Sequence, residues 1–526
     1  MKKLLSLTVA VLMLCLAFAS CGGSDGDNDS SAAQSKTELS APEQTSSELS
    51  APEDPGENSG SGGDIWNDGF KYATDEFYGK TVRIFTVSTT RHTYAEVQFA
   101  PVDEENVPDT VNNAVRERND YIYDHYGVTI ETRVADYPSE FLLEEIYGST
   151  ANYDLVCESV DRMVNRISDK LFIPLDDYFD FSDSWWDSRC MDNLSLDGVK
   201  HYFVSGECML TDVDHIYLTL YNKNLYANNA DLVATYGDLY DLVRENKFTL
   251  DAYTQMSRAV SHPDENGEYG IEGTFGNLSH SYGATIMVNG CGVSMVEKSA
   301  DGLRCAVADD YAQTVFDKVY DLMHDRTITQ RAELIIGKAP EGSNSRYGFA
   351  ELEYMFRTGK GLFYNTTVNS ISILKNKDLG FTVGILPICH FSEDDSEYYC
   401  PVNRYQSSVI GIPVSNVENV EVAAFVLNAL GYYNTELPSN VKNAYYELTL
   451  KLQASDSEDD FDMLDLIFKS RFYDLGSIFP IDVLTGMYGS LINAESNTLT
   501  SYYAAHQNEI EDALAKTYAD YIDSLS

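Results

Sequence analysis

From about residue 80 onward, the chain alternates short, branched apolar segments with segments of helical character. A strand is expected at residues 80–87, a helix at 112–126 and an alternating strand at 127–134. A helix at 140–147 and a buried strand at 153–157 continue the pattern. Strands that alternate with helices pair in parallel, because each helix returns the chain across a face of the sheet. The sequence therefore predicts an α/β lobe around a largely parallel sheet.

The same signals restart in the second half of the chain. Further strands are expected at residues 217–222, 381–387 and 408–413, followed by a helix at 417–432. Near the C-terminus, apolar residues recur every four positions, which predicts a helix that packs on one face: Ile510, Leu514, Tyr518 and Ile522. About 460 residues follow residue 65, too many for one hydrophobic core and enough for two lobes.

The first 64 residues have a different character. Lys2 and Lys3 precede an apolar run at residues 4–19, and small residues stand directly before Cys21. This pattern is typical of a bacterial lipoprotein signal peptide of residues 1–20, with Cys21 as the site of lipid attachment. Residues 21–64 are rich in Gly, Ser, Asp, Glu and Pro and contain a ten-residue repeat, so we expect a disordered tether. The predicted location is extracytoplasmic, anchored to a bacterial membrane by lipid.

The formal net charge of −47 and the pI near 4.3 exclude a nucleic-acid-binding protein that relies on a basic face. They also argue against an anionic ligand held by bulk electrostatics. Seven cysteines follow Cys21. The spacing allows three local disulfides, 190/208, 291/305 and 389/400, which would leave Cys157 unpaired. The sequence is equally compatible with reduced thiols. There is no CxxC motif to indicate a zinc site.

Six segments, in chain order, resemble the extracellular solute-binding proteins of bacterial ABC importers, in the branch that includes maltose-type binding proteins. They are Tyr-Asp-Leu-Val at 153–156, Phe-Ile-Pro-Leu-Asp at 172–176, Tyr-Leu-Thr-Leu-Tyr-Asn-Lys-Asn-Leu at 217–225, Phe-Arg-Thr-Gly-Lys-Gly-Leu-Phe at 356–363, Gly-Ile-Leu-Pro at 384–387 and the helix at 417–432. None of these segments is a catalytic signature, but together they span most of the expected globular part.

The resemblance implies a two-lobed α/β fold of the type II periplasmic-binding-protein class, with a ligand cleft between the lobes. Lobe one is expected at residues 65–216 and 365–410, and lobe two at 217–364 and 411–526. The implied function is that of a monomeric receptor that binds a small solute, a mono- or oligosaccharide, without a cofactor or metal. A bound ligand favours the closed arrangement of the lobes, which the permease subunits of the importer then recognise.

Sugar sites combine aromatic platforms with charged hydrogen-bonding groups, because sugars present flat apolar faces and many hydroxyls. Asp161 and Arg162 follow the strand at 153–157, where maltose-type proteins place an acidic–basic pair on the sugar. Trp185 and Trp186 are two of only three tryptophans. Adjacent aromatic residues point in opposite directions on a strand, so we expect at most one of the two to stack on ligand.

Further candidates stand at expected strand ends and crossings between the lobes. Tyr282 opens a helical segment of lobe two, and Tyr473 lies in the late segment of that lobe. The remaining candidates are Tyr364, Asn365, Arg404 and Tyr405. The alternative for each tyrosine is ordinary packing, since the chain contains 37.

No catalytic motif is complete. Gly79-Lys80-Thr81 lacks the first glycine of a phosphate-binding loop and precedes a strand instead of following one. The segment 264–269 lacks the spacing of a calcium loop and fits a turn better. The sequence therefore favours a binding protein. A secreted glycan hydrolase and a surface adhesion or signalling lipoprotein remain the alternatives.

Overall fold

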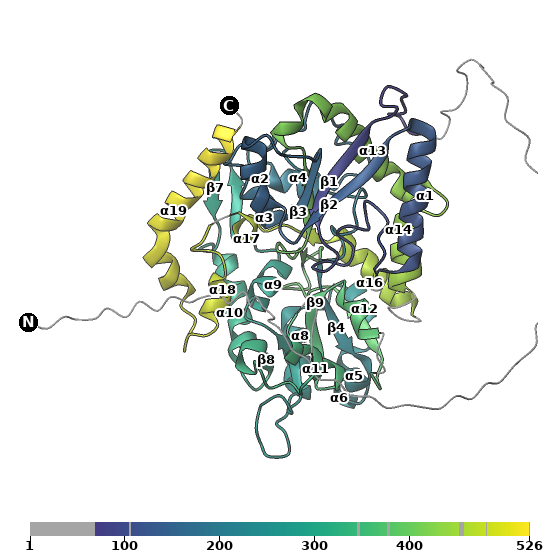
Figure 1. The fold of residues 1–526 in the computed structure, drawn as a ribbon. Coiled ribbons are helices and arrows are strands. Elements are labelled where there is room, and N and C mark those ends of the chain that lie inside the picture. Colours follow the sequence, from purple (N-terminus) through teal and green to yellow (C-terminus); the bar gives the residue numbers. More distant parts are fainter. Residues whose placement is uncertain are drawn as a thin grey trace, which may run out of the picture. The chain divides into compact units, whose positions relative to one another are not determined.

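The computed structural model describes residues 69–524, except 105–106, 344–347, 376–378, 452–456 and 480. Its N-terminal elements are β1 (Thr81–Val87), α1 (Asp109–Tyr126), β2 (Thr129–Ala135), α2 (Ser139–Tyr147), β3 (Leu155–Ser159), α3 (Val160–Val164) and α4 (Ser188–Leu194). They follow the expected alternation closely (Figure 1). Gly127 ends α1 in the left-handed conformation, with φ of 65°, so the chain turns at once into β2.

The middle of the chain contains the second group of elements. They are β4 (Tyr217–Asn222), α5 (Lys223–Ala227), α6 (Ala230–Tyr236), α7 (Leu239–Arg244), α8 (Leu250–Val260), β5 (Phe275–Ser279), α9 (Gly283–Gly290), β6 (Val296–Ser299), β7 (Gly302–Cys305), α10 (Asp310–His324), β8 (Thr329–Arg331), α11 (Ala350–Arg357), β9 (Gly361–Thr367), α12 (Ser370–Lys375) and β10 (Val383–Leu386).

The remaining elements lie in the C-terminal part of the chain. They are β11 (Cys400–Pro401), β12 (Ser408–Gly411), α13 (Val420–Glu436), α14 (Val441–Tyr445), α16 (Glu458–Lys469), β13 (Arg471–Phe472), α17 (Leu475–Ile478), α18 (Met487–Leu491) and α19 (Leu499–Ser524). In α19, Ile510 and Leu514 are buried as the apolar stripe predicts, Tyr518 is half-buried, and Ile522, near the end of the helix, is exposed.

Two sheets organise the fold. The first has the order β12-β3-β1-β2, in which β1, β2 and β3 are parallel and β12 is antiparallel to β3. The second has the order β10-β4-β9-β5-β8, with β5 parallel to both β8 and β9. The strands β6 and β7, and β11 and β13, form two further two-stranded sheets. The described part of the chain is therefore a mixed α/β structure with two main sheets.

Two segments lie with a different sheet from the one expected. β10 falls in the range expected for lobe one, yet it pairs with β4 in the second sheet. α13 falls in the range expected for lobe two, yet it contacts β1 and α1, and its buried face joins the hydrophobic cluster that contains Ile84 and Ile122. The burial of this apolar helix over the first sheet decides its place, because apolar area removed from water stabilises the fold.

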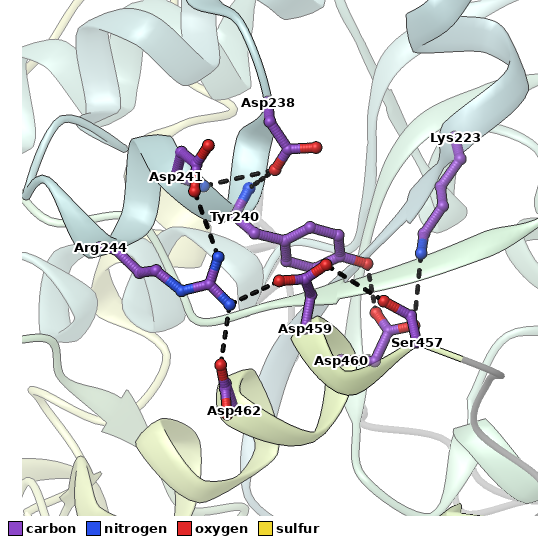
Figure 2. Close-up of polar contacts among 9 residues, drawn as sticks. All are labelled: Lys223, Asp238, Tyr240, Asp241, Arg244, Ser457, Asp459, Asp460 and Asp462. Carbon is purple, nitrogen blue, oxygen red and sulfur yellow. Dashed lines mark hydrogen bonds and ion pairs between the residues drawn. The ribbon is translucent and has the colours of Figure 1, made fainter.

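The helix α16 is fixed to the second sheet by the buried carboxylate of Asp460. This carboxylate accepts hydrogen bonds from the Ile385 backbone N–H of β10, at 2.9 Å, and from the Tyr240 hydroxyl, and Lys223 lies 3.4 Å from it. Figure 2 shows Tyr240 and Lys223 converging on Asp460, and Arg244 reaching three exposed carboxylates beside them. Asp460 thereby ties the start of α16 to the edge strand of the sheet.

All seven cysteines of the described residues are free thiols, and all but Cys305 are buried. The three possible local disulfides are therefore not formed. Among the described residues, no helix is both long and apolar enough to span a membrane. Cys21 and the expected tether lie outside the described residues.

Candidate functional site

The two sheets are joined by two chain segments that run side by side. One leads from Val204 to Tyr217, and the other leads back from Val402 to Ile410. Antiparallel bridges pair Val204 with Ile410 at one end and Ile216 with Val402 at the other. The paired segments connect β4 of the second sheet to β12 of the first. Residues on these segments are therefore placed where the two lobes meet.

Arg404 and Tyr405 lie on the returning segment. The Arg404 guanidinium carbon is 4.4 Å from the centre of the Tyr405 ring, and its Nη2 donates to the Tyr405 hydroxyl. Arg404 is only 8% exposed, whereas Tyr405 is 40% exposed. The Nε of Arg404 is buried without a hydrogen-bond partner among the described residues. A buried arginine donor thus stands beside an accessible aromatic ring.

Asp161 approaches Arg404 from lobe one, at the start of α3. Its backbone N–H donates to the Arg404 carbonyl oxygen at 3.3 Å. Burial raises the pKa of the Asp161 carboxyl, and the Ser159 hydroxyl and the Arg404 guanidinium oppose the rise. One carboxylate oxygen, Oδ1, is buried without a hydrogen-bond partner among the described residues. Unsatisfied buried polar atoms are costly, so this acceptor and the Arg404 Nε are suited to a ligand hydroxyl.

Lobe two contributes aromatic residues to the same place. The rings of Tyr217, at the start of β4, and Tyr282, before α9, have centroids 6.4 Å apart. His280 is stacked parallel to Tyr282, with centroids 6.2 Å apart. Burial raises the pKa of Tyr282 to about 12, although the nearby Ser477 hydroxyl and Arg404 guanidinium lower it. Arg404 also acts electrostatically on Tyr217. The Tyr217 and Tyr282 hydroxyls are therefore within electrostatic range of the Arg404 guanidinium.

A second group of charged residues lies at the carboxyl ends of the parallel strands of the first sheet. The guanidinium groups of Arg91, after β1, and Arg162, on α3, lie 4.0 and 4.1 Å from the Tyr137 ring centre. Both come within 3.5 Å of one oxygen of the fully buried Glu158. Burial raises the pKa of Glu158, and the Ser139 backbone N–H, which donates to it at 2.7 Å, opposes the rise.

The other residues named from the sequence have internal partners. Trp185 and Trp186 are 8% and 6% exposed and belong to the hydrophobic core of lobe one. The Tyr473 hydroxyl donates to Asp187 at 2.8 Å. In β9, Tyr364 is buried against Phe356, with ring centroids 5.4 Å apart, and the Asn365 amide donates to the Thr219 hydroxyl. The structure thus brings together Asp161, Arg404 and Tyr405, with Tyr282 within range of the Arg404 charge. Arg162 follows Asp161 on α3.

Sequence reasoning missed Tyr217, Arg91 and Tyr137. Tyr217 stood inside a segment already assigned to a strand, and its position at the first residue of β4 was the available signal. Arg91 and Tyr137 follow β1 and β2. Ligands of open α/β sheets bind outside the carboxyl ends of the strands. A search of all such ends would have found both residues.

The segment 264–269 forms a turn. One carboxylate oxygen of Asp264 accepts the backbone N–H groups of Asn266 and Glu268, at 2.8 and 2.9 Å. Among the residues that the structure describes, no group of three or more His, Cys, Asp and Glu side chains is arranged to hold a metal ion.

The sequence matches no protein-family model, and no curated protein is significantly similar to it. Solved structures do match. A cyclo/maltodextrin-binding protein complexed with maltotetraose is 13% identical, with a TM-score of 0.50, over 85% of this chain and 97% of that one. UgpB from Mycobacterium tuberculosis, in complex with glycerophosphocholine, is 13% identical, with a TM-score of 0.51, over 82% and 98%.

A third similar structure is the cyclic alpha-maltosyl-1,6-maltose binding protein from Arthrobacter globiformis. It is 14% identical, with a TM-score of 0.50, over 85% of this chain and 98% of that one. At such low identity these matches show the fold. The chain therefore has the two-lobed α/β fold of type II periplasmic binding proteins, the fold expected from the sequence, and its structural neighbours are binding proteins.

Proposed function

We propose that this protein is the solute-binding receptor of an ABC importer and that it binds a mono- or oligosaccharide between its two lobes. The observation that carries the proposal is the contact of Asp161 of lobe one with Arg404, beside the exposed Tyr405 ring. Tyr282 of lobe two lies within range of the Arg404 charge. The fold supports the proposal, and so do structural neighbours whose ligands include maltotetraose.

Each residue has a role that its surroundings favour. Asp161 accepts a hydrogen bond from a sugar hydroxyl through Oδ1, and Arg404 donates through Nε, because both atoms are buried without partners among the described residues. Tyr405 stacks on a sugar face, since it is the exposed aromatic residue of the group. Tyr282 closes the site from lobe two. Contacts from both lobes make ligand binding favour one lobe arrangement over others.

Delivery to a membrane permease and anchoring through lipid on Cys21 belong to the same proposal. The signal-peptide pattern and the polar composition of residues 21–64 support them. A flexible tether on a lipid would keep the binding protein near its permease while leaving it free to rotate.

A thermal-shift screen of the purified full chain tests the proposal. A saccharide at 100 times its dissociation constant should stabilise the protein by about 2.7 kcal/mol. The screen uses mono- and oligosaccharides, with amino acids, peptides and polyamines as controls. A shift with a control class alone would reject the carbohydrate, and turnover of a bound glycan would favour the hydrolase. No shift with any compound would overturn the receptor proposal.

Tyr405→Ala then tests the site itself. Stacking on an aromatic ring contributes about 0.5–1.5 kcal/mol, so the affinity for the saccharide should fall about two- to tenfold. The melting temperature should change little, because Tyr405 is 40% exposed. Tyr123→Ala, on α1, is the matched control, since Tyr123 is 56% exposed and lies outside the proposed site. Equal affinity of both variants, measured by calorimetry, would remove Tyr405 from the site.

A further inference from the structure

Arg91, Arg162 and Arg404 are less tightly paired with carboxylates than Arg133 of the same lobe. Arg133 holds Glu145 with two short bonds, of 2.7 and 2.6 Å. By contrast, the carboxylates nearest to Arg162 are Glu140 at 3.3 Å and Glu158 at 3.5 Å. Charge-assisted bonds between arginine and carboxylate are normally about 2.7–2.9 Å long. The positive charge of Arg162 is therefore only loosely compensated.

The positive charge of Arg91 is also only loosely compensated. Its short bond, of 2.7 Å, goes to the backbone carbonyl oxygen of Asp136, a neutral acceptor. Its described contact with a carboxylate is the 3.5 Å contact with Glu158, which Arg162 shares. One carboxylate thus stands between two guanidinium groups. Both side chains keep solvent contact, at 21% and 32% exposure, so some of their N–H donors are accessible.

Arg404 is the third arginine of this group. Its described hydrogen bond goes to the neutral hydroxyl of Tyr405, and its Nε has no partner among the described residues. The three arginines come from neighbouring places: Arg91 and Arg162 share Glu158, and Asp161, next to Arg162, contacts the Arg404 backbone. Arg162 and Arg404 also act electrostatically on the buried Asp161 carboxyl. The positive charge of three arginines, none of which makes a short described bond to a carboxylate, is therefore gathered around the buried carboxyls of Asp161 and Glu158 in a chain whose net charge is −47.

We infer that the saccharide bound by this protein carries an anionic group, a carboxylate, sulfate or phosphate, which Arg91, Arg162 and Arg404 recognise. This inference rests on the proposed function and specifies the class of saccharide that the protein binds. Arginine presents a planar fork of N–H donors that matches the oxygens of such groups in pairs. The negative field of the whole chain repels anions at long range, so recognition depends on these short contacts.

Matched ligand pairs test the inference by calorimetry on the full chain. The carboxylate pair is digalacturonic acid and galactobiose, the sulfate pair is galactose 6-sulfate and galactose, and the phosphate pair is glucose 6-phosphate and glucose. In at least one pair the acidic member should bind at least tenfold more tightly. The pair that does so identifies the anionic group. Neutral sugars that bind equally well or better would overturn the inference and leave the proposed function intact. No binding in any pair, together with a blank saccharide screen, would overturn both.

Two variants assign the effect to the arginines. Arg91→Gln and Arg162→Gln should each weaken binding of the acidic ligand at least tenfold and leave the affinity for its neutral counterpart within about twofold. Arg116→Gln is the matched control, because Arg116 is exposed on α1 and donates to Asn113. An equal loss for the acidic and the neutral ligand would indicate a structural role for the arginines and contradict the inference. Circular dichroism confirms that each variant is folded.

Discussion

Trp186→Ala should lower the free energy of unfolding by about 3–5 kcal/mol, the usual cost of truncating a buried large aromatic residue. Trp186 is 6% exposed and packs edge-to-face on Phe179, with ring centroids 5.4 Å apart. Its backbone also pairs with Gly206. The truncation leaves a cavity that this part of the core does not readily fill. Urea unfolding followed by tryptophan fluorescence and circular dichroism measures the loss.

Trp186→Phe is the matched variant. It retains an aromatic ring, and the indole Nε1 that it removes is buried without a hydrogen-bond partner among the described residues. We expect Trp186→Phe to cost clearly less than Trp186→Ala. An alanine variant that keeps full stability but loses saccharide binding would contradict this account and place Trp186 in the ligand site.

Arg471→Met should destabilise the fold by about 3–5 kcal/mol, because it removes a buried cation that two buried carboxylates share. Arg471 lies 3.0 Å from Asp212 and 3.1 Å from Asp187, and both carboxylates are nearly inaccessible to water. Lys442 remains 3.7 Å from Asp212 in the variant. Arg471 stands in β13, and Asp212 lies on the segment that joins the two sheets, so the ion pair also supports that junction.

The cost of Arg471→Met should depend on pH. Burial raises the pKa of Asp212 to about 6, even though Lys442 and Arg471 lower it. Below pH 6 Asp212 therefore takes up a proton in the folded protein and needs its cation less. Urea unfolding should show a smaller difference between the variant and the parent protein at pH 5 than at pH 8. A difference that is the same at both pH values would contradict the assignment to Asp212.

Arg244→Met is the control for removing an arginine. Arg244 contacts Asp241, Asp459 and Asp462, as Figure 2 shows, but its side chain is 38% exposed. Water screens exposed ion pairs, so this substitution should cost about 1 kcal/mol or less. A loss as large as that of Arg471→Met would show that the exposed cluster is as important for stability as the buried one.

The secondary structure of the first lobe was predictable, because period-two and helical patterns reflect burial that the local sequence encodes. The sheet to which each segment belongs was harder to predict. The position of β10 depends on its pairing with β4, which is distant in the sequence, and that of α13 on which sheet buries its apolar face. Neither the strand pairing of β10 nor the packing of α13 can be predicted from the local sequence.

The candidate site shows the same limit. Asp161 was predicted because it follows a strand that resembles one of a known family, and Arg404 because it precedes an expected crossing between the lobes. The burial of Trp186 could not be read from its neighbours in sequence, since it packs on Phe179 and pairs with Gly206 only in the folded chain. Arg91 and Arg162 become neighbours only through the parallel register of β1 and β3. No local sequence pattern predicts this proximity.

The most direct test of a ligand held between two lobes is hydrogen–deuterium exchange of the full chain, with and without the saccharide that gives the largest thermal shift. We expect the ligand to slow amide exchange at Asp161 and Arg162 of lobe one, around Tyr282 of lobe two, and at Arg404 and Tyr405 on the connecting segment. All of these segments should show the same dependence on ligand concentration. Protection confined to one lobe, or protection elsewhere that leaves these segments unchanged, would contradict this expectation.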